Sequence, residues 1–246
     1  GASRFSFVMP RSEDSVLNCG SRTLDVAIPT RCGNPLPPWK RPMDIAVLLL
    51  SMPILLPLCA GISMLIKAAS PGPILFTQTR VGLGGRPFRC FKFRTMHAGV
   101  TTGTHEAYLA ELIRRGGVMR KLDDSGDGRL IFGGRLLRAS GLDELPQLIN
   151  VLQGEMSIVG PRPCTLNEFE LYEERQKRRF QALPGLTGLW QVSGKNKTTF
   201  EQMIALDLQY VRDKSCWLDA VIMVKTVKVL LEQVFDLLHK RKNSEW

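Results

Sequence analysis

The sequence predicts a mixed α/β fold: a small domain attached to a membrane by one apolar helical segment. Three observations predict it. The stretch from Ile45 to Ile66 carries no charged residue, two short strand-like segments joined by a glycine-rich turn follow it, and the rest of the chain shows apolar residues at helical spacing. With 246 residues, 44% hydrophobic and 23% charged, the chain is long enough for one core of ordinary size and an appendage.

The composition predicts a phosphate-rich partner. The net charge is +10 and the isoelectric point is near 9.6, which suits a nucleic acid, a nucleotide or an anionic membrane surface, and charge alone does not choose among them. The six cysteines form no CxxC pair, so we expect neither a zinc site nor a disulfide framework, and a reducing cytoplasm is the simpler interpretation. We expect no signal peptide in the first 30 residues.

The sequence divides into three segments. Residues 1–38 are rich in Ser, Pro, Gly and Asn without a sustained apolar period, which predicts a loosely ordered tail. Residues 39–69 hold the apolar stretch, and residues 70–246 form the folded domain on the cytoplasmic side.

The apolar stretch is long enough to span a bilayer, but Pro53 and Pro57 lie near its centre. A proline removes a backbone hydrogen bond and kinks or breaks a helix, so we expect a re-entrant hairpin that enters the membrane, breaks at Pro53 and returns. Cations on both flanks, Lys40-Arg41 and Lys67, favour two cytoplasmic ends. The alternatives are a straight spanning helix with a proline kink and, less favoured, a buried core helix.

The folded domain should begin with a β-hairpin, Ile74–Val81 and Phe88–Met96, around a turn at Gly82–Gly85. Alternation places Phe91 and Phe93 on one face of the second strand and Lys92 and Arg94 on the other. Helical spacing and stop signals then predict several amphipathic helices. These are 106–115, 140–152 with Pro146 in its first turn, 166–181, 199–211 and 218–239, the last with a basic end suited to a membrane surface.

The pair Asp143-Glu144 is the strongest candidate for chemistry. It lies near the expected start of the helix 140–152, where acidic residues are usually caps. A functional interpretation is favoured by the arginines around the pair, because one guanidinium group can bind two phosphate oxygens at once. These are Arg129, Arg135, Arg138 and Arg162. Two carboxylates among arginines suit metal-assisted phosphoryl transfer, with one as nucleophile and another as ligand to Mg2+.

Each of the other polar residues is weak when taken alone. Lys92 and Arg94 could form a solvated strand face, and Pro161-Arg162-Pro163 could be a rigid loop with an exposed arginine. Asp207 and Tyr210, three residues apart on an expected helix, could be surface residues.

The combination of motifs, however, resembles a known family, the monotopic phosphoglycosyl transferases, which are bacterial sugar transferases of exopolysaccharide synthesis. The matching strings run in the family's order from about residue 39 to the end of the chain. They are Lys40-Arg41-Pro42-Met43-Asp44, the apolar hairpin, Pro71–Gly82, Lys92–Met96, Leu142–Leu148 around the acidic pair, Ser157–Pro163, and Pro184–Val192.

The resemblance implies a small membrane-associated α/β enzyme at the cytoplasmic face of a bacterial inner membrane. It implies Mg2+ dependence and transfer of a sugar phosphate from a UDP-sugar to polyprenyl (undecaprenyl) phosphate, with release of UMP. By resemblance, Asp143 is the nucleophile and Glu144 helps to bind Mg2+, with Asp143 beside it. Arg138 and Arg162 contact phosphate or the uridine nucleotide, and Lys92, Arg94 and Arg129 belong to the same polar site.

This sequence departs from the family's pattern at three positions, and none of them touches the acidic pair. Met52 stands where Ser usually precedes the helix-breaking proline, Gly141 where Ser often precedes Leu-Asp-Glu, and Leu183 where a basic residue often precedes Pro-Gly.

Two alternatives remain beside the phosphosugar transferase. The first is a basic peripheral membrane or nucleic-acid binding module without catalysis. A nucleic-acid binder should interleave exposed aromatics with basic residues, but only 7% of residues are aromatic, so we expect no nucleic acid partner. A glycosyltransferase that moves the sugar without its phosphate would release UDP. Likeness to glucose- and galactose-transferring members suggests a hexose donor, and the oligomeric state stays open.

Overall fold

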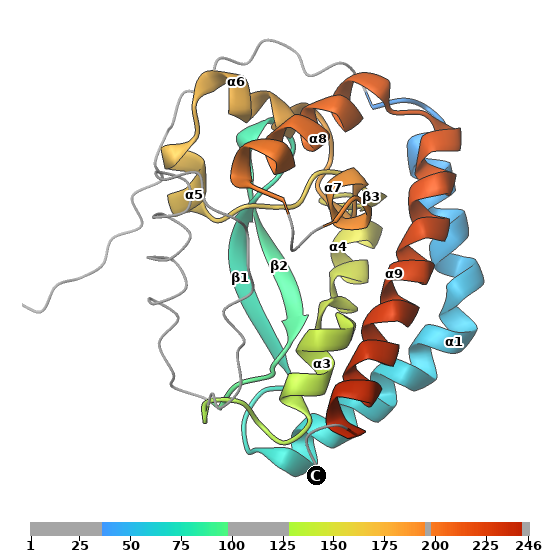
Figure 1. Cartoon of the computed structure of the whole chain (residues 1–246), viewed down its shortest axis with the longest axis vertical. Coiled ribbons are helices and arrows are strands. Elements are labelled where there is room, and N and C mark those ends of the chain that lie inside the picture. Colours follow the sequence, from blue (N-terminus) through green and yellow to red (C-terminus); the bar gives the residue numbers. More distant parts are fainter. Residues whose placement is uncertain (1–35, 98–127, 195–197, 243–246) are drawn as a thin grey trace, which may run out of the picture.

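The structure, a computed structural model, describes residues 36–97, 128–194 and 198–242. A β-hairpin stands near the centre of the domain, with short helices beside it and around one of its ends and two long helices, α1 and α9, along the outer edge (Figure 1). The tail predicted for residues 1–38 and the helix predicted for residues 106–115 lie wholly or mostly outside the described residues.

Helix α1 (Lys40–Ala69) is one α-helix with Pro53 and Pro57 inside it. It is long and apolar enough to cross a membrane by length and composition. Figure 1 shows it running beside α9 and then turning beneath it, and the two prolines inside it remove backbone hydrogen bonds, which favours such a bend. The helix has no break between two separate arms, and a re-entrant hairpin is therefore not confirmed.

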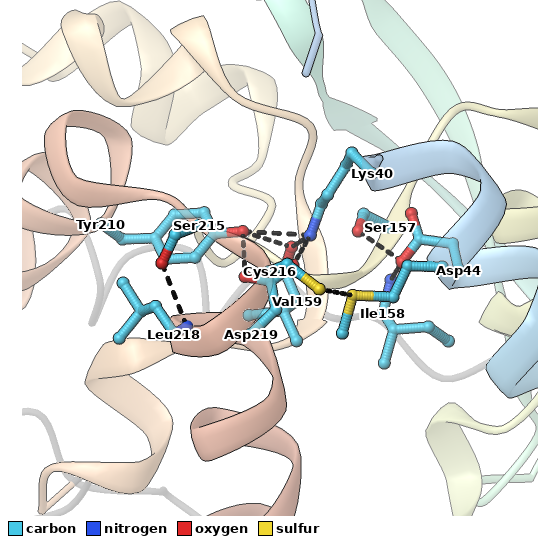
Figure 2. A network of polar contacts seen from close by, with 11 residues as sticks. Lys40, Asp44, Ser157, Ile158, Val159, Tyr210, Ser215, Cys216, Leu218 and Asp219 are labelled. Atoms are coloured by element: carbon cyan, nitrogen blue, oxygen red, sulfur yellow. Dashed lines mark hydrogen bonds and ion pairs between the residues drawn. The ribbon is translucent and has the colours of Figure 1, made fainter. Parts of the chain in front are cut away.

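The first turn of α1 is held by buried polar contacts (Figure 2). The Lys40 ammonium, 5% exposed, donates to the Asp219 carboxylate, the Tyr210 hydroxyl and the Val159 carbonyl. The Asp44 carboxylate accepts from the Ser157 hydroxyl and the Ile158 amide at 2.9 and 3.0 Å. Because a buried charge is tolerated only when it is paired, these contacts fix the start of α1 on the domain.

Both ends of α1 pack against the domain, and its middle does not. Leu48 lies in a cluster with Phe88 and Cys90, whereas Ile62 and Ile66 lie in a second cluster with Phe93. Between these contacts large apolar side chains face outward, among them Leu50 at 81% and Ile54 at 72% exposure. An apolar face of this size on a folded domain marks a contact with a membrane or another protein.

The predicted β-hairpin is confirmed. Strand β1 (Leu75–Val81) pairs antiparallel with β2 (Pro87–Phe93), and a short 3-10 turn, η1 (Leu83–Gly85), joins them. The sequence did not predict a second, parallel pair of strands, β3 (Ser157–Val159) and β4 (Gly185–Thr187). With three residues each, these strands are too short to show the alternation by which strands are recognised.

Two of the predicted helices are interrupted. The helix expected over 140–152 is wrong as a single element: α3 (Gly134–Ser140) stops at Gly141, whose φ of +74° is left-handed, and α4 (Gln147–Gln153) begins after Pro146. The segment 166–181 divides into α5 (Leu166–Leu171), α6 (Glu174–Lys177) and the 3-10 turn η3 (Arg178–Gln181). Thr165 and Glu173 begin α5 and α6 with capping boxes, so each piece has its own start signal.

The last two helices are confirmed with small shifts. Helix α8 (Phe200–Asp213) begins with a capping box between Thr199 and Gln202, and α9 (Cys216–Lys242) follows it. A short helix, α7 (Leu189–Val192), precedes them and contributes the buried Trp190 to the main core cluster. Asp207 and Tyr210 of α8 are each 1% exposed, so the possibility that they are surface residues is wrong.

Candidate active site

The acidic pair lies in a one-turn 3-10 helix, η2 (Leu142–Glu144), between α3 and α4. The Glu144 amide donates to the Gly141 carbonyl at 3.1 Å, which closes the turn. Asp143 and Glu144 are both half-buried, so their carboxylates are held by the fold and still accessible. The pair therefore precedes α4 by a few residues instead of lying within the first turn of a longer helix.

Strand β2 supplies a cation to this pair. The Lys92 ammonium donates to Glu144 Oε1 at 2.8 Å, and the two side chains are 23% and 39% exposed. The register of the hairpin places Lys92 opposite Phe76 at the end of the pairing next to Phe93, which is buried. The structure thus brings together three residues that the sequence predicted for one site, although 52 positions separate Lys92 from Glu144.

A pocket beside the Lys92–Glu144 pair collects further cations and amides. It is lined by Arg80, Cys90, Lys92, Glu144, Gln147, Arg162, Pro163, Gly185 and Gln191. Of the predicted arginines, Arg162 is the one that lines it. Three cations around one pocket give it a positive potential, which suits a substrate that carries phosphate.

Arg162 is positioned by the parallel pairing of β3 and β4. The Gly160 amide donates to the Thr187 carbonyl at 2.8 Å and the Gly185 amide donates to the Pro161 carbonyl at 2.9 Å. A Cβ on Gly160 would overlap the Leu183 carbonyl oxygen, so the two segments lie backbone against backbone. The Arg162 carbonyl then accepts a hydrogen bond from Arg179 Nη2 at 2.8 Å.

Arg179 and Asp207 form a buried ion pair behind the Arg162 loop. Each residue is 1% exposed, and Arg179 Nη2 lies 2.5 Å from Asp207 Oδ2. Burial is the largest single influence on the pKa of Arg179 and lowers it, but the negative charges of Asp207 and of groups further away, Glu168 among them, together outweigh burial and raise the pKa. Arg179 also donates to the Tyr172 hydroxyl at 3.1 Å. This pair is a support that sequence patterns did not reveal, because an acidic residue on an amphipathic helix normally faces solvent.

Sequence reasoning also missed Arg80, Gln147 and Gln191. Arg80 belongs to β1 and is 9% exposed. Burial and the nearby Arg162 charge lower the pKa of Arg80. The signal that could have found it is an arginine near the end of the first strand of the central hairpin, where a buried charged side chain needs a partner or a ligand.

The remaining predicted residues lie elsewhere around the pair. Arg94, 6% exposed, donates to the Ser70 and Pro71 carbonyls at 2.8 and 2.9 Å, so it holds the turn after α1 and does not line the pocket. Arg129 accepts a backbone hydrogen bond from His97, and Arg138 lies in the last turn of α3. Neither of these two lines the pocket, and Pro53 is an exposed residue of α1.

The donor set of the acidic pair fits a divalent cation that is bound mainly through substrate. Asp143 and Glu144 offer adjacent carboxylates, and Lys92 contacts one oxygen of Glu144. Within residues 36–97, 128–194 and 198–242, no group of three acidic, His or Cys side chains gathers to form a complete metal cage. Mg2+ is commonly held by one or two carboxylates together with substrate phosphates and water, which is the arrangement that this site permits.

Comparison with known proteins finds relatives that are named for exopolysaccharide production and for sugar transfer. The exopolysaccharide production protein ExoY of Sinorhizobium fredii is 39% identical over 190 residues, which are 76% of this chain and 83% of that protein. The UDP-glucose:undecaprenyl-phosphate glucose-1-phosphate transferase of Caulobacter vibrioides is 41% identical over 214 residues, which are 82% of this chain and 74% of that protein.

Other relatives are longer. The galactosyl transferase CpsE of Streptococcus agalactiae is 44% identical over 161 residues. These residues are 65% of this chain but only 35% of CpsE, so the chain spans about a third of that relative's length. The match to the family itself covers residues 37–233, from the first turn of α1 through most of α9. With its acidic pair, its cationic pocket and this match, the chain belongs to the bacterial sugar transferase family.

Proposed function

We propose that this protein transfers a sugar 1-phosphate, with a hexose as the sugar, from a UDP-sugar to undecaprenyl phosphate and releases UMP, the initiating step of exopolysaccharide synthesis. The observation that carries the proposal is the acidic pair Asp143-Glu144 beside a pocket lined by Lys92, Arg80 and Arg162. The C. vibrioides relative is named for this reaction with UDP-glucose. A relative from Salmonella typhimurium, 40% identical over 162 residues, is named an undecaprenyl-phosphate galactose phosphotransferase.

The chemistry assigns separate tasks to the two carboxylates. Asp143 attacks the phosphorus that carries the sugar, the bond from that phosphorus to the UMP oxygen breaks, and the sugar phosphate stays on the Asp143 carboxylate. A phosphate oxygen of undecaprenyl phosphate then attacks the same phosphorus and frees Asp143. Lys92 and Arg162 neutralise the charge that gathers on the phosphate oxygens.

Glu144, with Asp143 beside it, would hold Mg2+. When bound, this ion would draw charge from the phosphate oxygens and so ease the displacement at phosphorus. Lys92 orients Glu144 by its hydrogen bond to Oε1. Arg138, in the last turn of α3 five residues before Asp143, is proposed to contact phosphate as well.

The order of release tests this mechanism. Wild-type protein with a radiolabelled UDP-sugar and no acceptor should release UMP and retain label after an acid quench. Asp143→Asn should lose both signals, because a neutral amide is a poor nucleophile, whereas Glu144→Gln should recover partly in excess Mg2+. Release of UDP would indicate transfer of the sugar alone, and UMP release only with acceptor, or label retained by Asp143→Asn, would overturn the two-step reaction.

We further propose that α1 is re-entrant and that the domain lies on the cytoplasmic face of the inner membrane. Support comes from the packing of both ends of α1: Leu48 and Ile66 both reach residues of β2 and its neighbours, while the apolar middle faces outward. A helix whose two ends contact one folded domain cannot place those ends on opposite sides of a bilayer. Trp217 of α9, 78% exposed, adds apolar surface next to Cys216, whose thiol contacts Met43 in the first turn of α1.

Cysteine accessibility tests this topology. Single cysteines introduced in place of Pro38 and of Ala69, in a cysteine-free background, should both be shielded from an impermeant thiol reagent added to intact cells and both react after lysis. Pro53→Leu restores a backbone hydrogen bond and should move part of the population towards a spanning form. Labelling of the Pro38→Cys variant alone in intact cells would show that α1 crosses the membrane.

A further inference from the structure

A second hollow in the surface lies apart from the acidic pair, between α6 with η3 and the C-terminal end of α8. Its volume is about 510 Å3, and it shares no lining residue with the pocket beside Glu144. Two apolar side chains of α8, Leu208 and Val211, line part of it. Four cations also line it, namely Arg175, Arg178, Arg212 and Lys214, and we call the site the cationic hollow. Cations of two separate segments that meet around a cavity of ligand size indicate a site for an anionic group.

The charges of the cationic hollow are neutralised only in part. Arg212 donates two hydrogen bonds to its exposed neighbour Asp213, at 2.7 and 3.0 Å. Within the part of the chain that the structure describes, Arg175, Arg178 and Lys214 form no ion pair with a carboxylate. Lys214 is half-buried, and burial together with the positive charge of Lys40 lowers its pKa. An anion in the hollow would therefore stabilise the charged form of Lys214.

The cationic hollow lies next to the start of the membrane helix α1. Lys214 is close enough to Lys40, the first residue of α1, for their charges to interact. Two residues after Lys214, the Cys216 thiol contacts the Met43 sulfur at 3.7 Å, and Figure 2 shows Cys216 in the same neighbourhood as Lys40. The next residue, Trp217, is 78% exposed. One rim of the hollow therefore continues into the junction between the domain and α1.

This junction corresponds in depth to the headgroups of a membrane that receives α1. The large exposed apolar side chains of α1 begin at Leu49, six residues after Met43, which is about 9 Å along an α-helix. The headgroup region on each side of the hydrocarbon core is about 5–8 Å thick. An exposed tryptophan such as Trp217 is typical of this level. The cations beside it are thus placed near the phosphates of the lipids.

We infer that the cationic hollow binds the phosphate headgroup of an anionic phospholipid, such as phosphatidylglycerol, and so fixes how the domain sits on the membrane. A soluble phosphate carries similar charge, but the three arginines are exposed to water, where ion pairs are weak and screened by salt. Anionic lipids are concentrated at the surface that α1 enters, and each cation near such a surface strengthens association about fivefold. The inference goes beyond the proposed reaction and rests on the proposed entry of α1 into the membrane.

The lipid preference of the purified full chain tests the inference. The protein in detergent would be equilibrated with equal amounts of phosphatidylglycerol and phosphatidylcholine, and native mass spectrometry would count the lipids that stay bound. The wild-type protein should retain phosphatidylglycerol in preference to phosphatidylcholine. Arg175→Gln combined with Arg178→Gln removes two cations and should lower this preference about 25-fold, whereas lysine at both positions keeps the charge and should keep most of the preference.

The matched control removes the same charge elsewhere. Arg86 and Arg89 are exposed arginines at the start of β2 and do not line the hollow. Arg86→Gln combined with Arg89→Gln should therefore leave the preference for phosphatidylglycerol at its wild-type value. Both double variants should keep the wild-type melting temperature within about 2 °C, because their side chains are exposed.

Three results would overturn the inference. The first is equal retention of the two lipids by the wild-type protein, and the second is an unchanged preference in the folded Arg175→Gln, Arg178→Gln variant. The third is calorimetric binding of inorganic phosphate that this variant loses, without any lipid preference in the wild type, which would identify a site for soluble phosphate.

Flotation with vesicles of pure phosphatidylcholine checks the placement of α1 separately. The wild-type protein and both double variants should float, because α1 and not the cationic hollow would hold them there. A wild-type protein that does not float would refute the membrane placement of α1, and the lipid site falls with it. Flotation without a preference for phosphatidylglycerol overturns the lipid site alone.

Discussion

Replacing Asp207 by Asn should destabilise the protein strongly, although the change alters only one atom. Arg179 and Asp207 are each 1% exposed and their side chains lie 2.5 Å apart. The Asn side chain keeps the shape of Asp but removes its charge, so the Arg179 guanidinium stays buried without a counter-ion. Arg179 also holds the Arg162 carbonyl, so the change should disturb the pocket wall as well.

The expected size follows from this burial. Removing one partner of a buried ion pair costs about 3–5 kcal/mol, because the other charge is left desolvated and unpaired. For a domain of this length each kcal/mol lowers the melting temperature by about 2–4 °C, so Asp207→Asn should lower it by about 6–20 °C. Replacing both partners, Arg179→Met with Asp207→Leu, should recover most of the stability but not the activity, because the support of Arg162 is lost.

Differential scanning calorimetry on the purified protein measures these changes, and UMP release measures the activity. The matched control is Glu174→Gln, which removes the acidic partner of the exposed Lys177–Glu174 pair, with Glu174 83% exposed, and should change stability by less than about 0.5 kcal/mol. The reasoning is refuted if Asp207→Asn costs no more than this control. It is also refuted if the double variant is less stable than Asp207→Asn.

Three further changes test other parts of the structure. Lys92→Met should lower UMP release at least tenfold while the melting temperature changes by less than about 4 °C. The reason is that the partly exposed Lys92–Glu144 pair contributes at most about 1 kcal/mol to stability. A larger drop in the melting temperature would indicate a structural role for Lys92. Arg94→Leu should lower the free energy of unfolding, measured by urea titration, by about 2–4 kcal/mol, because it removes the hydrogen bonds that Arg94 donates to the Ser70 and Pro71 carbonyls. An unchanged urea midpoint would contradict this structural role of Arg94. Gly160→Ala should destabilise the protein by about 3 kcal/mol or more, because the added Cβ would overlap the Leu183 carbonyl. Gly61→Ala, whose Cβ would meet nothing within 4 Å, should be tolerated. Equal melting temperatures of the two variants would show that the backbone around Gly160 can shift to accept the methyl group.

Features that depend on neighbouring residues were predictable from the sequence. The β-hairpin follows from two apolar segments around a glycine-rich turn, and α8 follows from Thr199 and Gln202 at capping distance. The acidic pair with Arg162 was predicted as one site, and the structure places Arg162 and Glu144 in the wall of the same pocket. In each case the signal is written within a few positions of the chain.

What the tertiary structure decided is the environment of each charged side chain. Lys40 has the sequence appearance of a flanking membrane cation, yet its ammonium is buried against Asp219, 179 positions away. Asp207 resembles a surface residue of α8, yet it is buried against Arg179. Arg94 alternates with Lys92 in the sequence, yet it holds the turn after α1 and lies outside the pocket wall.

The sequence by itself therefore determined the family, the acidic pair and the local elements, because motifs and periodicity are properties of short segments. The tertiary structure alone decided which cations face the pocket and which support the fold. The free energy of a buried charge depends on partners that approach from distant segments, and a local pattern cannot specify them. Arg80 illustrates this: it lines the pocket from β1, and the nearby carboxylate is that of Glu168, which belongs to α5.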